Sequence, residues 1–331
     1  MSTIITQELK DVKSRLNTFV PTAEIIGCHP ANVQIRITRT KHKQCVCQFQ
    51  FPQDYPKVPI LLELKSKRFP DKVLNAIANV TELESKKLVG KPQIISLVKF
   101  INKFIEDNPL LVCSEEISQI KKKIISEEDE FKVKQKAGVI DYKIKSCRYF
   151  LHIKITIPDR YPEECISIEL KGSNFPSILE AHFFGQAKEI ARQCIQPPLR
   201  KDPKAPPFEA KPSIRPVLEY VSSQCVHKFP VETCPCCGKP ALAEDPEQCE
   251  RNPYADFFVE WVYCKHIYHH TCLDKYMKSP PFTGGKKCLK CGSRIYHEKW
   301  NISPELAEER WAHKEARKRE IEEVTDFLDL M

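Results

Sequence analysis

A cluster of cysteines and histidines in the last third of the chain constrains the fold more than any other feature. Two C-x2-C pairs enclose a C-x-H-x2-H-x2-C segment. A tight turn brings both thiolates of a C-x2-C pair to one ion, and zinc suits mixed thiolate and imidazole ligands. The spacing therefore predicts two closed tetrahedral zinc sites. The eight predicted ligands are Cys234, Cys237, Cys264, His266, His269, Cys272, Cys288 and Cys291.

Some of these assignments have alternatives. Cys236 could replace Cys237, and His270 could replace His269. Cys249, in the polar loop between the first and second groups of ligands, could also be recruited. We expect these three residues not to bind metal, because His270, for instance, would disturb the two-residue spacing on both sides.

The series resembles the RING finger in its two-histidine form. A single zinc ribbon or another treble-clef arrangement is the alternative. That family interleaves its two sites, so the resemblance implies that ligands one, two, five and six share one ion. Four protein ligands per ion leave no position for water or substrate, so both zinc ions are expected to be structural. The implied first site is Cys234, Cys237, His269 and Cys272, and the implied second site is Cys264, His266, Cys288 and Cys291.

In the RING family the folded surface binds a ubiquitin-charged conjugating enzyme and positions its thioester for transfer. The resemblance implies that Cys236, Tyr276 and Leu289 make this contact, and internal packing is the alternative role of each. Gly292 stands where the family commonly has a cation that contacts ubiquitin. Arg294 is the nearest substitute, and its alternative role is that of a solvated strand residue.

The first two thirds of the chain contain an internal repeat at an offset of 106 residues. Phe49–Pro70 aligns without a gap to Ile155–Pro176, and both segments contain a Tyr-Pro and a Phe-Pro at the same spacing. We interpret the two segments as parts of two copies of one domain, in which Tyr55 and Tyr161 occupy equivalent places.

Each copy is expected to contain a helix, a meander of strands and further helical segments, which points to an α+β fold with an antiparallel sheet. In the first copy the predicted elements are a helix at Thr3–Phe19, strands at Val33–Thr38, Cys45–Phe51 and Ile60–Leu64, and helices at Asp71–Leu83 and Ile94–Asp107. In the second copy they are a helix around Glu115–Glu130, strands at Val139–Lys145, Tyr149–Ile157 and Ile166–Leu170, and a helix near Ile178–Ile195.

Proline after tyrosine keeps the tyrosine extended and ends strand pairing, so the chain must leave the sheet and return. Tyr-Pro followed by Phe-Pro resembles the ubiquitin-conjugating fold, in which active enzymes carry His-Pro-Asn and then a cysteine. Here the next cysteines are Cys113, which is too distant, and Cys194, which lies in a predicted helix. Both copies therefore resemble the non-catalytic relatives called RWD domains. An unrelated α+β repeat is the alternative.

These patterns predict four regions. They are an RWD-like domain at 1–112, a second at 113–228, a RING-type zinc finger at 229–300 and a C-terminal helical tail at 301–331. The prolines of residues 197–216, inside the second domain, exclude regular helix or sheet, so the segment is expected to be a tether or a long ordered excursion. A short helix at Ser213–Gln224 is expected to close the second domain. The tail is expected to begin after Ser303 and to pack Leu306, Trp311 and Ile321 on the RING.

Composition narrows the class of protein further. Nine glycines and the absence of a glycine-rich phosphate loop argue against a nucleotide-binding fold. The net charge of +8 is mild and scattered, so nucleic acid is not expected as a partner. With neither a membrane-spanning apolar run nor a secretory signal, we expect a cytoplasmic or nuclear location. The eight remaining cysteines are expected to be small buried hydrophobes, and His227 and His297 to be surface histidines.

Tandem RWD-like domains followed by a C-terminal RING resemble the FANCL-like architecture of the Fanconi anaemia group L ubiquitin ligases. The resemblance implies a RING-type E3 ubiquitin-protein ligase with two structural Zn²⁺ ions and no covalent ubiquitin intermediate. Its expected partners are a ubiquitin-conjugating enzyme (E2), ubiquitin and a protein substrate recognised by the RWD pair. The alternative is a non-catalytic RWD/RING scaffold that mediates protein–protein interactions. Leu289, which stands where RINGs often have proline, and Gly292, which stands where they commonly have a cation, favour this alternative.

Overall fold

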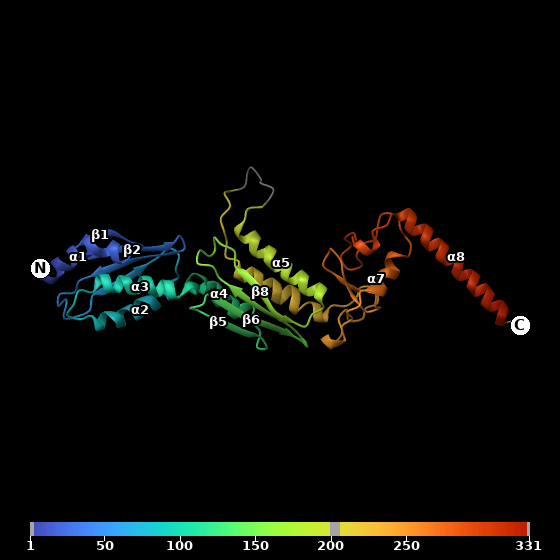
Figure 1. Ribbon diagram of the computed structural model, residues 1–331, viewed down its shortest axis with the longest axis horizontal. Helices are drawn as coiled ribbons and strands as arrows, with labels where there is room; N and C mark the ends of the chain where they lie inside the picture. The colour runs from blue at the N-terminus through green and yellow to red at the C-terminus, as the bar shows by residue number, and fades with distance from the viewer. Residues whose placement is uncertain (1–2, 199–205, 330–331) are drawn as a thin grey trace. The chain divides into compact units, whose positions relative to one another are not determined.

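The computed structural model describes residues 3–198 and 206–329 (Figure 1). Part of the predicted proline-rich segment, residues 199–205, lies outside the described residues, as do both ends of the chain. The chain divides into two compact units, which are described separately. The first unit comprises Met1–Lys143, His152–Lys171 and Gln186–Tyr220, and the second comprises Ile144–Leu151, Gly172–Gly185 and Val221–Met331.

The first unit opens with a helix, a four-stranded antiparallel sheet in the order β1-β2-β3-β4, and two further helices. Strand β1 was not predicted from the sequence, and the other elements lie where their patterns indicated. The elements are α1 (Thr3–Phe19), β1 (Ala23–His29), β2 (Asn32–Thr40), β3 (Lys43–Gln50), β4 (Leu61–Lys65), α2 (Asp71–Lys87) and α3 (Ile94–Asp107).

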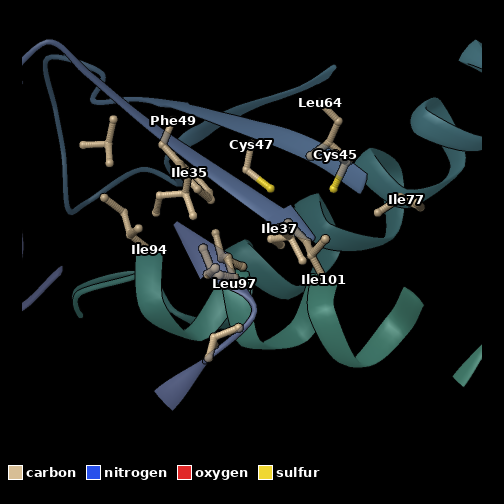
Figure 2. Packing of buried hydrophobic residues seen from close by; sticks show 14 of the residues in the cluster. Ile35, Ile37, Cys45, Cys47, Phe49, Leu64, Ile77, Ile94, Leu97 and Ile101 are labelled. Carbon is tan, nitrogen blue, oxygen red and sulfur yellow. The ribbon is translucent and has the colours of Figure 1, made fainter. Parts of the chain in front are cut away.

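The core of this domain follows from the two periodicities of its elements. Alternate residues of β2 and β3 point to one face, and Ile35, Ile37 and Cys47 on that face are buried. Helix α3 covers them with an apolar stripe at helical spacing that includes Leu97 and Ile101, as Figure 2 shows. The cysteines of β3 are therefore packing residues, as the sequence predicted, whereas the same prediction is wrong for Cys147 and Cys165, which are exposed.

The same order of elements recurs after residue 113. A helix, a sheet in the order β5-β6-β7-β8 and two more helical segments follow one another. The elements are α4 (Ser114–Lys123), β5 (Glu130–Lys134), β6 (Val139–Ser146), β7 (Tyr149–Thr156), β8 (Ser167–Ser173), α5 (Ser177–Ile195) and α6 (Ile214–Glu219), which a π-helix continues to Val226.

The helix predicted around Glu115–Glu130 is wrong in its second half, because α4 ends at Lys123 and β5 follows. The lysines of the last turn suit the negative end of the helix dipole, whereas the acidic run after them does not. A turn forms there instead, in which the Ser126 amide donates to the carboxylate of Asp129 (2.9 Å).

A buried polar contact ties the first helix of the first domain to the loop after β3 and to the last helix. The hydroxyl of Tyr55 donates to a carboxylate oxygen of Glu8, which is almost fully buried in α1. The other oxygen of Glu8 accepts from the amides of Gln93 (2.7 Å) and Ile94 (2.8 Å), at the start of α3. Amides at a helix start lack helical partners, so one carboxylate satisfies two of them.

An equivalent contact occurs in the second copy of the elements. The hydroxyl of Tyr161 donates to Glu116 of α4 (2.7 Å) and accepts from the amide of Ser213 (2.7 Å). The other oxygen of Glu116 accepts from the amide of Arg215 (2.6 Å), at the start of α6. Tyr55 and Tyr161 therefore occupy equivalent places, each between a glutamate of the first helix and the start of the last helix.

The second unit contains a chain of aromatic rings. Ring centroids are separated by 4.8 Å between Tyr149 and Phe175, 5.3 Å between Phe175 and Phe183, and 5.1 Å between Phe183 and Phe229. Phe229 is 5.5 Å from Trp261. These contacts join the Ile144–Leu151 and Gly172–Gly185 segments to the cysteine-rich region, which contains β9 (Val259–Trp261), β10 (Ile267–His269) and α7 (His270–Met277).

The tail forms helix α8 (Pro304–Asp329), which begins directly after Ser303 as predicted. Its predicted packing is wrong for Leu306, which is 39% exposed, and for Ile321, which is 58% exposed, whereas Trp311 is half-buried. Ala307 is the buried residue of its first turns. A charged helix with few apolar residues has little surface to bury, which explains the exposed face. No helix among the described residues has the length and apolar character needed to cross a lipid bilayer.

Candidate metal centre

The first C-x2-C pair lies in a tight turn, here called the first knuckle (Cys234–Lys239). The amide of Gly238 donates to the carbonyl of Cys234, and the amide of Cys234 donates to that of Lys239, both at 2.8 Å. Gly238 has φ of +70°, a conformation that favours glycine because it has no Cβ. The turn thereby folds Cys237 back beside Cys234.

The second knuckle (Cys288–Ser293) repeats this geometry. The amide of Gly292 donates to the carbonyl of Cys288 (2.8 Å), and the amide of Cys288 donates to that of Ser293 (2.7 Å). Gly292 has φ of +72°. This residue stands where the RING family commonly has a cation, and the structure explains the glycine: it completes the turn that brings Cys291 to Cys288.

The four central residues come from a hairpin and the helix that follows it. Strand β10 pairs with β9, and Cys264 and His266 lie in the turn between these strands. His269 ends β10, and α7 begins at the next residue. Cys272 lies one helical turn further on, so it faces the same side as His269.

The structure gathers all eight predicted residues into two groups, with ligand atoms within 4.8 Å of one another in each group. The groups interleave along the chain in the order that the RING resemblance implied. One group is Cys234, Cys237, His269 and Cys272, and the other is Cys264, His266, Cys288 and Cys291.

The spacing inside each group fits a tetrahedral zinc ion. In the first, Cys237 Sγ lies 3.3 Å from His269 Nδ1. In the second, Cys264 Sγ and Cys288 Sγ each lie 3.4 Å from His266 Nδ1. With zinc–sulfur and zinc–nitrogen bonds of ordinary length, the sulfur–nitrogen edge of a tetrahedron is about 3.5 Å. Each cluster could therefore hold one zinc ion.

Hydrogen bonds around the clusters prepare the ligands for a cation. His269 Nε2 donates to the carbonyl of Pro240 (3.0 Å), which leaves Nδ1 free to face the metal. Burial opposes ionisation of Cys234, but hydrogen bonds with His269 and with amides of the knuckle lower its pKa to about 6. Hydrogen bonds with Ser293 lower the pKa of Cys291 to about 7. Both thiols thus ionise more readily than Cys264 and Cys272 of the same clusters, whose pKa values burial and the neighbouring cysteines raise to about 12.

The three alternative ligands lie outside both clusters. The Cys249 thiol lies 3.0 Å from the hydroxyl of Tyr149. His270 Nδ1 lies 2.7 Å from a carboxylate oxygen of Glu260. Cys236 is exposed at the tip of the first knuckle. The structure therefore separates these residues from the eight by geometry as well as by spacing.

Glu260 is a structural residue that sequence reasoning missed. It is 1% exposed and contacts Lys299, His270 and His297. Burial opposes its ionisation, but hydrogen bonds from His297, Lys299 and His270 lower its pKa to about 2. The prediction that His297 is a surface histidine is wrong, since its side chain is only 13% exposed. A charged residue inside the apolar strand segment VEWV was the available signal.

Trp300 packs against the two histidines that contact Glu260. Its ring centroid lies 5.7 Å from that of His270 and 4.7 Å from that of His297, and its indole nitrogen donates to Asp274 of α7 (2.8 Å). His227, the other predicted surface histidine, is half-buried, with Nδ1 3.0 Å from the carbonyl of Ser222.

The residues predicted to contact a conjugating enzyme converge on the second knuckle. Leu289 is 51% exposed, and its amide donates to the hydroxyl of buried Tyr268 (3.1 Å). Burial raises the pKa of Tyr268, and the nearby thiols of Cys288 and Cys236 contribute. On the other side, the hydroxyl of Tyr276 donates to the carbonyl of Lys287 (2.8 Å). Tyr276 is half-buried, so part of this residue serves internal packing.

Comparison with known proteins identifies one domain. Residues 4–105 match the model of the RWD domain family. This domain is related to ubiquitin-conjugating enzymes and commonly mediates protein interactions. A search of curated proteins finds no match to the chain. The first helix, sheet and two covering helices lie within the matched range. Residues 4–105 therefore form an RWD domain.

Proposed function

We propose that the protein is a RING-type E3 ubiquitin-protein ligase with a FANCL-like order of domains. In this proposal an RWD domain occupies residues 1–112, a second RWD domain 113–228, a RING 229–300 and a helical tail 301–331. The RWD pair recognises a protein substrate, and the RING recruits a ubiquitin-charged E2. The protein works in the cytoplasm or the nucleus.

The case for a second RWD domain rests on the repeated architecture. Both copies contain a helix, a four-stranded antiparallel meander and two further helices. Both place the tyrosine of a Tyr-Pro pair between a glutamate of the first helix and the start of the last helix. Similar composition alone would not produce the same hydrogen-bonded contact among three segments that are distant in the sequence. In the second copy the partners are Tyr161, Glu116 and Ser213.

The observation that carries the RING assignment is the pair of interleaved Cys3His clusters. Each cluster offers four ligands, which closes a tetrahedral zinc ion against water. The ions then hold the fold together, and the activity comes from the surface. Cys236, Tyr276 and Leu289 supply that surface, with Arg294 as the cation nearest to the usual position.

A discharge assay tests the proposal. Zinc-loaded protein should bind two zinc ions per chain and should release ubiquitin from a charged E2. Leu289→Asp should keep both ions, because Leu289 is not a ligand, but should slow discharge about 5- to 30-fold, as expected for a central contact in a small interface. Cys264→Ser should lose zinc and activity together. If protein with both ions discharges no E2 in a broad panel, the ligase proposal is wrong.

The second candidate is a scaffold. In it residues 229–300, here called the zinc module, dock partners without activating an E2. Leu289 in place of the usual proline and Gly292 in place of a cation favour it. In that case the full panel would give no discharge while partner binding persisted, which separates the two candidates.

A further inference from the structure

We infer that the face of the partner that docks on this zinc module is acidic, so that the module selects conjugating enzymes with carboxylates around their docking surface. This inference rests on the proposed function and deepens it by naming the charge of the partner.

Three segments build the docking face: the first knuckle, helix α7 with its last turn, and the second knuckle with the residues around it. Residues 235–239, 270–279 and 286–294 contain seven lysines and arginines and one carboxylate, Asp274. Three thiolates and one Zn²⁺ give each site a net charge of about −1, so two loaded sites do not cancel this excess.

Part of this positive charge is used inside the module. Lys290 pairs with buried Glu232 (2.5 Å), and Lys278 pairs with Asp274 (2.7 Å). Lys286 is buried and donates to the carbonyl of Ser279. The remaining cations are exposed and have no carboxylate within ion-pair distance in the parts of the chain that the structure describes. These four are Lys239, Lys275, Lys287 and Arg294.

Two of the free cations, Lys287 and Arg294, lie beside Leu289, the exposed apolar residue of the face. Lys287 lies two residues before Leu289, and its backbone pairs with that of Arg294 in an isolated bridge. The Arg294 guanidinium lies 5.2 Å from the centroid of the Tyr296 ring. The Arg294 side chain also passes close to Gly285, where an added Cβ would lie 2.6 Å from its Nε. An apolar centre with a charged rim is the usual anatomy of a protein interface.

Exposed charges that have no carboxylate partner in the module influence which proteins associate with this face. Opposite charges accelerate association, and like charges placed opposite one another disfavour it. Exposed cations beside Leu289, with two more on the same three segments, therefore attract an acidic face and reject a basic one. Salt screens exposed charges, so this selection should weaken as ionic strength rises.

The test uses the full-length, zinc-loaded protein and a panel of ubiquitin-charged conjugating enzymes grouped by the charge of the surface that docks on RING domains. The wild-type protein should discharge the acidic group faster, and salt should reduce the difference. The triple variant Lys275→Glu/Lys287→Glu/Arg294→Glu should keep two zinc ions but lose roughly tenfold or more in rate with the acidic group. Lys314→Glu, an exposed position on α8, is the matched control and should behave as wild type.

The other outcomes overturn the inference in distinguishable ways. Equal discharge of both groups, or no effect of the triple variant, would contradict it while the ligase proposal stood. No discharge with any enzyme would overturn both. Tight binding of short DNA or RNA oligonucleotides that the triple variant abolishes would assign the face to nucleic acid. A dimer in light scattering that the triple variant dissociates would assign it to a second copy of the chain.

Discussion

Single residues in the zinc module have roles that their spacing alone does not explain. Gly238 and Gly292 have positive φ and donate back to the first cysteine of their knuckles. Glu260 gathers two histidines and a lysine in the interior of the module. Neither kind of residue binds metal, yet both determine whether the ligands meet.

Replacing Gly292 should weaken the second zinc site. A side chain at φ of +72° costs about 1–2 kcal/mol, because its Cβ approaches the backbone. We expect Gly292→Val to lower the zinc affinity about 5- to 30-fold, measured by competition with a chromogenic chelator. Gly185→Ala in α5 is the control, since its Cβ would meet nothing within 4 Å and alanine favours a helix. Unchanged zinc affinity in Gly292→Val would contradict this role.

Removing the charge of Glu260 should destabilise the module. Glu260→Gln removes the buried carboxylate that Lys299 and His297 contact, and because Lys299 is partly exposed the cost should be about 1–3 kcal/mol. Because the folded-state pKa of Glu260 is lowered to about 2, its stabilising effect is complete above the ordinary carboxyl pKa and is lost as the pH falls toward 2. The full difference should therefore appear at pH 7 in denaturant unfolding of the zinc-loaded protein. Glu323→Gln, exposed on α8, should change little.

At the scale of secondary-structure elements, the two copies share one hydrogen-bonding device. It joins the first helix, the segment after the third strand and the start of the last helix. A glutamate of the first helix binds a tyrosine hydroxyl after the third strand and the amides that begin the last helix. Burial raises the pKa of both tyrosines, Tyr55 and Tyr161, so both hydroxyls stay protonated donors at neutral pH. The device explains why a helix at the start of each copy stays attached to elements far along the chain.

If the device is equivalent in both copies, removing either hydroxyl should have a similar cost. Tyr55→Phe deletes the hydrogen bond to buried Glu8, and Tyr161→Phe deletes those with Glu116 and with the Ser213 amide, so each should cost about 1–3 kcal/mol. Hydrogen exchange in α1 and α4, respectively, should report local loosening. Tyr254→Phe, at an exposed position, is the control. A loss confined to one copy would contradict the equivalence.

At the scale of the whole molecule, the zinc module packs against other segments of the second unit. The aromatic chain from Tyr149 to Trp261 joins it to segments of the second copy, whereas the RWD domain at residues 4–105 contributes no residue to either cluster. The metal sites and the first domain should therefore respond differently to loss of zinc.

Chelation tests this difference. Stripping zinc should unfold residues 230–300, because structural zinc ions contribute folding free energy directly. The RWD domain should keep its hydrogen-exchange protection. Around Phe175 and Phe183 protection should fall, because Phe229 and Trp261 lose their support. Elemental analysis before chelation should give two zinc ions per chain. Loss of protection throughout residues 4–105 would show that the domain depends on the metal.

The sequence by itself determined what depends on short spacing. The period-two alternation of Val33, Ile35 and Ile37 predicts a half-buried strand, and the eight candidate metal-ligating positions follow the spacing of tight turns and one helical turn. Only the tertiary structure decided which distant groups meet, such as Glu8 with Tyr55 or Glu260 with Lys299. The unpredicted strand β1 and the early end of α4 were likewise decided by the tertiary structure. Local patterns record the preferences of neighbouring residues, whereas a buried polar contact or a strand pairing depends on how the whole chain packs.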